Sequence, residues 1–176
     1  MTRARPPGAG AMLVERLTGQ EPWAVLAAID AIADASFPEG LSVRDELART
    51  WGRIWIARTA ADALPVGFLV AWHVADELHV LNIATTPAMR RRGVARALMD
   101  EALAYAAREH IRLLLLEVRR SNVAAIKLYR GLGFSASGVR PNYYSNNGED
   151  AVEMMLTLDT TTGAPLAGSD EVRVDD

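Results

Sequence analysis

Several residue types are missing or scarce in this chain of 176 residues, and each absence narrows what the protein can be. There is no cysteine, which excludes disulfide bonds, thiolate metal ligands and a cysteine nucleophile. No apolar run approaches the roughly 20 residues that a membrane-spanning helix needs. Lysine occurs once, at Lys127, so nearly all positive charge is carried by arginine. We expect a cytoplasmic protein without a membrane partner.

The overall charge is also low, with a formal net charge of −3 and a pI of about 5.6. A nucleic-acid-binding surface over the whole domain would need a clear excess of positive charge, so we expect no direct nucleic-acid partner. The three histidines, His73, His79 and His110, do not have metal-ligand spacing, and we expect no metal. Half of the residues are hydrophobic, which is enough for one domain with a substantial core.

The two ends of the chain differ in composition from the middle. Residues 1–11 are rich in proline and glycine and lack the apolar core of a signal peptide, which predicts a disordered lead-in. Residues 159–176 are polar and acidic and predict a disordered tail. Residues 12–158 are expected to form a single folded domain.

Hydrophobic periodicity in that domain predicts an α/β fold. Helical spacing appears over residues 22–37, 41–50, 93–109 and 122–133. Short apolar or alternating segments predict strands over residues 12–18, 53–59, 66–74, 77–86, 112–120, 134–140 and 151–159, with a loop over 141–150. The passage from residue 77 to residue 120 should join two parallel strands through a right-handed helical crossover. The result is a mixed central sheet of about seven strands with helices on both faces.

The densest positive charge lies in the stretch "RRRGVARAL" at residues 90–98. This stretch follows a predicted strand and opens a predicted helix, whose first turn has unpaired N–H groups and a partial positive charge. Gly93 would let the backbone approach a ligand closely. The stretch is therefore a candidate phosphate site, although a solvated arginine-rich helix start is the plainer alternative. It lacks the patterns of a Walker loop and of the dinucleotide fingerprint.

The segments "NIATTPAMRRRGVARALM" and "LLEVRRSNVAAIKLYRGLGF" resemble the core of a GNAT-superfamily N-acetyltransferase. Arg90, Gly93 and Ala95 match that family's acyl-CoA loop, written Q/R-x-x-G-x-G/A. The resemblance extends over residues 12–158. Together with "NYY" and "GEDAVEMML", it is closest to the RimI group, which acetylates the N-terminal alanine of a small-subunit ribosomal protein. A GNAT fold implies that strands 77–86 and 112–120 splay apart to admit the pantetheine arm.

The resemblance also implies which residues bind acetyl-CoA, the expected cosubstrate. Backbone groups of the strand before the loop would bind the acetyl-pantetheine arm: Ile83, Ala84 and Thr85. The loop and helix start would wrap the pyrophosphate: Arg91, Arg92, Gly93, Val94, Ala95 and Arg96. Asn122 would hydrogen-bond the cosubstrate further along, and it is equally suited to a plain helix N-cap.

Two residues are implied to carry the chemistry. Glu117 would be the general base, directly or through water, and Tyr129 would protonate the departing CoA thiolate. Without the resemblance, Glu117 reads as an exposed strand residue and Tyr129 as a core aromatic. Tyr143 and Tyr144 would line the acceptor groove, or else form an exposed turn.

Three functions remain open from the sequence. The first is a protein N-terminal acetyltransferase acting on a ribosomal protein. The second is a GNAT enzyme acting on a small amine or a lysine side chain. The third is a catalytically silent acyl-CoA-binding module. The segment "SFPEGLS" at residues 36–42 departs from the RimI pattern beside the acceptor entrance, which leaves the acceptor peptide open.

Overall fold

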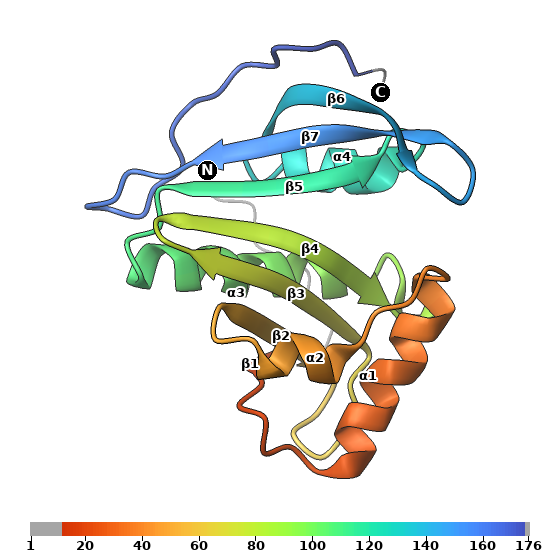
Figure 1. Ribbon diagram of the computed structural model, residues 1–176. Helices are drawn as coiled ribbons and strands as arrows, with labels where there is room; N and C mark the ends of the chain where they lie inside the picture. The colour runs from red at the N-terminus through yellow and green to blue at the C-terminus, as the bar shows by residue number, and fades with distance from the viewer. Residues whose placement is uncertain (1–11, 175–176) are drawn as a thin grey trace.

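The protein, described by a computed structural model over residues 12–174, is built on one mixed sheet with helices on both faces (Figure 1). This confirms the predicted fold class. In chain order the elements are β1 (Leu13–Arg16), α1 (Trp23–Ser36), α2 (Val43–Ala48), β2 (Gly52–Arg58), β3 (Gly67–Val74), β4 (Glu77–Thr85), a 3₁₀ turn (Pro87–Met89), α3 (Val94–Arg108), β5 (Leu113–Arg119), α4 (Val123–Arg130), β6 (Ser135–Tyr144) and β7 (Glu149–Thr157).

The seven strands lie in the order β1-β2-β3-β4-β5-β7-β6. The meander from β1 to β4 and the group β5, β7 and β6 are antiparallel, as hairpin-type connections favour. The strands β4 and β5 are parallel, and α3 provides the crossover between them. The parallel pair therefore joins two antiparallel halves at the centre of the sheet.

The two faces of the sheet are covered unequally. One face packs on α3 and α4 and holds the larger core cluster, which includes Leu98, Leu114, Ile126 and Met154. The other face packs on α1 and α2 through a second cluster drawn mainly from β2 and β3. These two helices reach only the β1–β4 half, where Figure 1 shows them. The corresponding face of β5, β7 and β6 lacks a helical cover among the described residues.

The C-terminal segment differs from the predicted disordered tail. Asp170 accepts a hydrogen bond from the Ala136 backbone N–H at 2.7 Å and pairs with Arg130 at 2.6 Å. The backbone N–H of Glu171 donates to the Ala136 carbonyl, and Val174 is buried in the larger core cluster. The segment thus covers the edge of β6, which a polar composition does not reveal. Residues 1–11, the predicted lead-in, lie outside the described residues.

The predicted loop at residues 141–150 is also largely strand. The strand β6 continues to Tyr144, which pairs with Glu149 at the start of β7, after a register shift that absorbs the extra residues. Two bulged positions explain why alternation failed to predict this hairpin. Between residues 12 and 174, no helix is long and apolar enough to cross a membrane. No metal-holding group of three or more acidic or histidine side chains occurs over the same range.

Candidate active site

The parallel pair at the centre of the sheet opens along its length. Pairing joins Glu77–Val80 of β4 to Leu113–Leu116 of β5 and then stops, although β4 continues to Thr85 and β5 to Arg119. In Figure 1 the two strands diverge toward their carboxyl ends. This confirms the predicted splay. It leaves backbone groups of both strands facing a gap in the middle of the sheet.

A β-bulge in β4 marks the point of divergence. Val70 pairs with Asn82 while Ala71 pairs with Val80, so Leu81 is the extra residue. Beyond the bulge, Ile83, Ala84 and Thr85 remain paired with β3 on one side only. The structure thus brings the three predicted pantetheine-binding residues to the edge of the opening, where their outward backbone groups are free to pair with an extended ligand.

The loop after β4 forms an open cradle at the start of α3. Arg91 and Gly93 both have positive φ, at 59° and 84°, and Gly93 is the N-cap residue of α3. No side chain caps this helix end, so its first N–H groups are open to a ligand. A Cβ atom built on Gly93 meets nothing within 4 Å. The positive φ therefore explains why glycine occupies this position. The open space next to it suits a phosphate group.

The predicted phosphate-binding residues play different parts in this cradle. The side chains of Arg90, Arg91 and Arg92 form no ion pair with another described residue. Arg96, in contrast, pairs with Asp100 one turn along α3 at 2.8 Å. The Val94 side chain is buried in the larger core cluster, so only its backbone is available to a ligand.

Close packing fixes the position of this helix end. A Cβ atom on Gly67 of β3 would lie 2.7 Å from Cγ1 of Val94 and 2.8 Å from the Ala84 carbonyl oxygen. Glycine at this position therefore lets the first turn of α3 rest directly on the β3–β4 hairpin. The cradle and the opening between β4 and β5 are consequently held together by the same contact.

The predicted acid lies on α4, on the same face of the sheet as α3. Asn122 caps this helix, because its Oδ1 accepts a hydrogen bond from the Ala125 N–H at 3.2 Å. The Tyr129 ring is buried and packs against Phe134 at a centroid distance of 5.9 Å. Burial, followed by the nearby Tyr144, raises the pKa of Tyr129 well above its usual range. Tyr129 therefore stays protonated at every physiological pH.

The predicted base lies on the opposite face of the sheet. The neighbours of Glu117 in β5, Leu116 and Val118, point into the core beneath α3 and α4, so Glu117 points to the uncovered face. Its Oε1 lies 3.3 Å from Nη1 of Arg140. The side chain is 27% exposed, so it is half-buried and accessible to solvent.

The two tyrosines of the predicted acceptor wall stand together on β6. The rings of Tyr143 and Tyr144 meet edge to face with centroids 5.2 Å apart. Arg140 lies over Tyr143 at 5.6 Å, and Arg119 lies over Tyr144 at 3.7 Å. Burial raises the pKa of Tyr144 to about 12. Electrostatic interactions of Tyr144 with both Tyr129 and Glu117 indicate that it lies near the two predicted catalytic groups.

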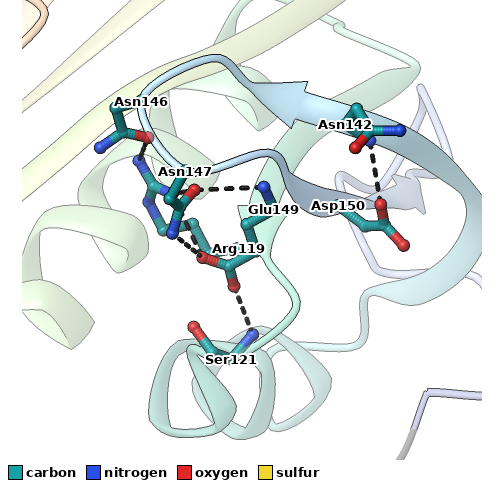
Figure 2. A network of polar contacts seen from close by, with 7 residues as sticks. All are labelled: Arg119, Ser121, Asn142, Asn146, Asn147, Glu149 and Asp150. Atoms are coloured by element: carbon teal, nitrogen blue, oxygen red, sulfur yellow. Dashed lines mark hydrogen bonds and ion pairs between the residues drawn. The ribbon is translucent and has the colours of Figure 1, made fainter.

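A polar network holds this hairpin to the end of β5 (Figure 2). Arg119 donates through Nη1 to Asn147 and Glu149, both at 3.2 Å, and through Nη2 to Asn146 at 3.1 Å. The other Glu149 oxygen accepts from the Ser121 N–H at 2.8 Å. Hydrogen bonds from Ser121 lower the pKa of Glu149 to about 2 against the opposing effect of desolvation, and hydrogen bonds from Arg119 and Asn147 add to the lowering. The hairpin is thereby fixed to the end of β5 and the start of α4.

Sequence reasoning missed the arginines and acids that organise this predicted acceptor wall: Arg119, Arg140, Glu149 and Glu153. Each lies on a strand, where charged residues usually face solvent. Their partners are distant in sequence and become neighbours only through the pairing of β5, β7 and β6. A signal for Arg119, Arg140 and Glu153 was the concentration of opposite charges in strands that were predicted to lie in the same sheet, whereas Glu149 fell in a predicted loop.

Comparison with known sequences identifies the family and several relatives. The profile of the Acetyltransferase (GNAT) family matches residues 23–134. The [ribosomal protein bS18]-alanine N-acetyltransferase of Escherichia coli is 40% identical over 93 residues, which is 52% of this chain and 63% of that protein. The aligned part thus spans less than two thirds of that relative.

Two solved structures are similar over longer stretches. The crystal structure of the ribosomal-protein-S18-alanine N-acetyltransferase from Escherichia coli has a TM-score of 0.70 and 26% identity, covering 92% of this chain and 97% of that one. A putative streptothricin acetyltransferase from Bacillus anthracis in complex with acetyl coenzyme A has a TM-score of 0.59 and 26% identity, covering 69% and 71% of the two chains.

Proposed function

This chain belongs to the Acetyltransferase (GNAT) family, and we propose that it transfers the acetyl group of acetyl-CoA to the N-terminal α-amine of a protein. The proposed acceptor is the N-terminal alanine of ribosomal protein bS18, which the names of its relatives supply. This acceptor would place the enzyme in the cytoplasm. The observation that carries the proposal is the central opening, with the phosphate cradle and Tyr129 on one face and Glu117 on the other.

Acetyl-CoA, which would supply the acetyl group, fits the open features of the α3 face. The uncapped N–H groups at Gly93 and the side chains of Arg91 and Arg92 would hold the pyrophosphate. Backbone groups of Ile83, Ala84 and Thr85 would bind the pantetheine arm, and one of their N–H groups would stabilise the oxygen that becomes negatively charged. Val94, Ala95 and Arg96 would complete the binding turn, with Asn122 beside the pantetheine.

We assign the general-base role to Glu117 and the general-acid role to Tyr129. An α-amine has a reference pKa of about 7.7–8.0, so one carboxylate, acting directly or through water, is enough to remove its proton. A lysine side chain, with a reference pKa near 10.4, would require a stronger base. The protonated Tyr129 hydroxyl would stabilise the departing thiolate and donate its proton as that group leaves. Tyr143 and Tyr144 would hold the first residues of the acceptor.

A small-molecule amine is a second candidate acceptor, favoured by the likeness to the putative streptothricin acetyltransferase. That likeness covers a smaller share of both chains than the likeness to the ribosomal-protein enzyme does. A silent acyl-CoA-binding module is less well supported, because binding alone requires neither a carboxylate at Glu117 nor a buried tyrosine at the opening.

The proposal is tested by incubating the protein with acetyl-CoA and three acceptors, followed by mass spectrometry. The first is a peptide that begins with the N-terminal sequence of bS18. The second is the same peptide with a blocked N-terminus and an internal lysine, and the third is streptothricin. We expect acetylation of the α-amine of the first peptide and little of the others. Faster acetylation of the blocked peptide or of streptothricin would select the second candidate, and no transfer to any acceptor would contradict the proposal.

A further inference from the structure

Glu117 has another acidic residue as its direct cross-strand neighbour. It pairs with Glu153 of β7 in the antiparallel register, so the two side chains point to the same uncovered face. Like charges directly opposite each other destabilise a strand pair and favour protonation of one carboxyl group. An enzyme that uses Glu117 as a base at neutral pH therefore needs a counter-charge at this place.

Arg140 of β6 supplies that counter-charge to both carboxylates. Its Nη1 lies 3.3 Å from Oε1 of Glu117, and its Nε donates to Oε1 of Glu153 at 2.6 Å. The same guanidinium lies over the ring of Tyr143. One planar group therefore contacts the predicted base, the opposing acid and the predicted acceptor wall, using the several donors that arginine presents in a fixed plane.

The backbone of β6 is shaped to allow this arrangement. Gly138 pairs with Glu153 across the sheet, next to the register shift that follows Ala136. A Cβ atom on Gly138 would collide with Oε2 of Glu153. The glycine thus leaves room for the Glu153 carboxylate to reach toward Arg140. This gap distinguishes the arrangement from an incidental surface ion pair.

Other charged groups near Glu117 do not replace Arg140. Tyr144 interacts with Glu117 but is neutral at physiological pH, since burial raises its pKa to about 12. Arg119 is engaged by Glu149 and by the hairpin asparagines. On the other side, β4 offers no titratable side chain between Leu81 and Thr85. Among these neighbours, Arg140 is the cation that contacts Glu117.

We propose that Arg140 is a positioning residue that bridges Glu117 to Glu153, offsets the repulsion between the two carboxylates and holds the Glu117 carboxylate in place for the acceptor amine. This rests on the proposed function, because it assigns Arg140 a part in the reaction of Glu117. A carboxylate has several acceptor positions, so Arg140 at one oxygen leaves the other free to take a proton. The Glu153 carboxylate holds the guanidinium while the amine binds.

The decisive experiment compares pH–rate profiles of kcat/KM with the bS18-type peptide for wild type, Arg140→Met, Arg140→Lys and the double variant Arg140→Met/Glu153→Gln. Arg140→Met leaves two facing carboxylates without a counter-charge. As the pH falls, Glu117 of this variant should therefore become protonated at a higher pH than Glu117 of wild type. We expect the acid limb to move up by about 0.5–1 pH unit, a shift reduced by the half-exposed position of Arg140. Arg140→Lys should keep the limb near that of wild type.

The double variant gives the sharpest outcome. Removing one cation and one anion leaves the net charge beside Glu117 unchanged, so the acid limb should return close to the wild-type position. Arg112→Met, which loses an arginine paired with Asp76 at the other end of β5, is the matched control and should not move the limb. CoA affinity measured by calorimetry should equal that of wild type in every variant, which confirms folding.

An acid limb that stays in place in a folded, active Arg140→Met protein would overturn the role of Arg140 while leaving the proposed function intact. The same conclusion follows if the double variant shows no return toward wild type. Failure of the proposed function is recognised separately, because wild type would then acetylate no N-terminal peptide at any pH.

Discussion

The arginines on the two sides of the central opening are used in opposite ways. In the cradle before α3, the side chains of Arg90, Arg91 and Arg92 form no ion pair with another described residue. On the acceptor side, Arg119 and Arg140 are bound by carboxylates, amides and tyrosine rings. The guanidinium groups of the first set can therefore pair with a ligand, whereas those of the second set already pair with groups of the protein.

This difference agrees with the ligand proposed for each side. A pyrophosphate brings its own negative charge, so open arginines and an uncapped helix start are sufficient. An amine must meet a carboxylate and a shaped wall held in fixed positions, which requires side-chain networks. We therefore expect substitutions in the cradle to weaken binding of the cosubstrate and substitutions in the Arg119 and Arg140 network to weaken binding of the acceptor. Substitution of Tyr129, beside the opening, should lower the turnover rate.

The largest effect should come from Tyr129→Phe, which removes the hydroxyl and keeps the ring that packs against Phe134. Turnover should fall by about 10²–10⁴-fold, as is typical for loss of a positioned acid. The loss should persist at every pH, since alkaline solution supplies no proton to the thiolate. Single-turnover kinetics together with a thermal melt would measure it. Near-normal turnover in a stable Tyr129→Phe protein would make Tyr129 a packing residue only.

Glu117→Gln should cause the next largest loss, of about 10²-fold near neutral pH. The loss should shrink as pH rises past the α-amine pKa of about 8, because free amine then forms without a base. Profiles of kcat from neutral to alkaline pH would show this rescue, with Tyr129→Phe as the unrescued control. An equal loss at every pH would mean that Glu117 orients the acceptor rather than removing its proton.

Gly93→Asp tests the cradle. An aspartate there adds a carboxylate to the open space at the start of α3 and strains the positive φ of 84°. CoA affinity measured by calorimetry should weaken at least about tenfold. Gly19→Asp is the control, because Gly19 has a similar φ of 89° and open surroundings but lies before α1. Equal CoA affinity in the folded Gly93→Asp and wild-type proteins would show that the turn at Gly93 does not bind the CoA phosphates.

Arg119→Met tests the acceptor side. Loss of the Arg119 guanidinium frees Tyr144 and the hairpin loop from the end of β5, because the stacking contact and three hydrogen bonds disappear together. We expect the KM for the peptide to rise by about three- to tenfold, which corresponds to roughly 1 kcal/mol of lost positioning. The KM for acetyl-CoA should not change. A rise confined to the acetyl-CoA KM would break the division between the two sides.

The smallest effect concerns acid stability. The pKa of Glu149 is lowered to about 2, so its contribution to stability is present above its unfolded pKa of about 4.3 and is lost as pH falls toward 2. Glu149→Gln should reduce the free energy of unfolding by about 0.5–1 kcal/mol at pH 7, a value discounted for solvent screening. Urea melts should show this difference shrinking between pH 5 and pH 2. A constant difference would assign it to packing instead.

Periodicity and motif predicted most of the fold because helices and buried strands carry their own patterns. The cap at Asn122 and the cradle at Gly93 were expected from local sequence, and the splay was expected from the family resemblance. The hairpin beyond Arg140 was not, because bulges interrupt its alternation. The packing of residues 159–174 was missed for another reason, since its key contacts run from Asp170 to the edge of β6.

The candidate site divides in the same way. Residues of the cradle are contiguous, so a short motif contains them. The partners of Glu117, in contrast, come from β6 and β7, which lie more than 20 residues away and meet β5 only through strand pairing. Sequence spacing cannot give this register, because one residue of slip moves every side chain to the other face.

Two-substrate steady-state kinetics would show whether the cosubstrate and the acceptor are bound by separate regions that meet at the opening. Gly93→Asp and Arg119→Met would be measured over a full matrix of acetyl-CoA and peptide concentrations. We expect Gly93→Asp to raise the KM for acetyl-CoA alone and Arg119→Met to raise the KM for the peptide alone. If each variant raised both constants equally, the cosubstrate and the acceptor would not be bound by separate regions.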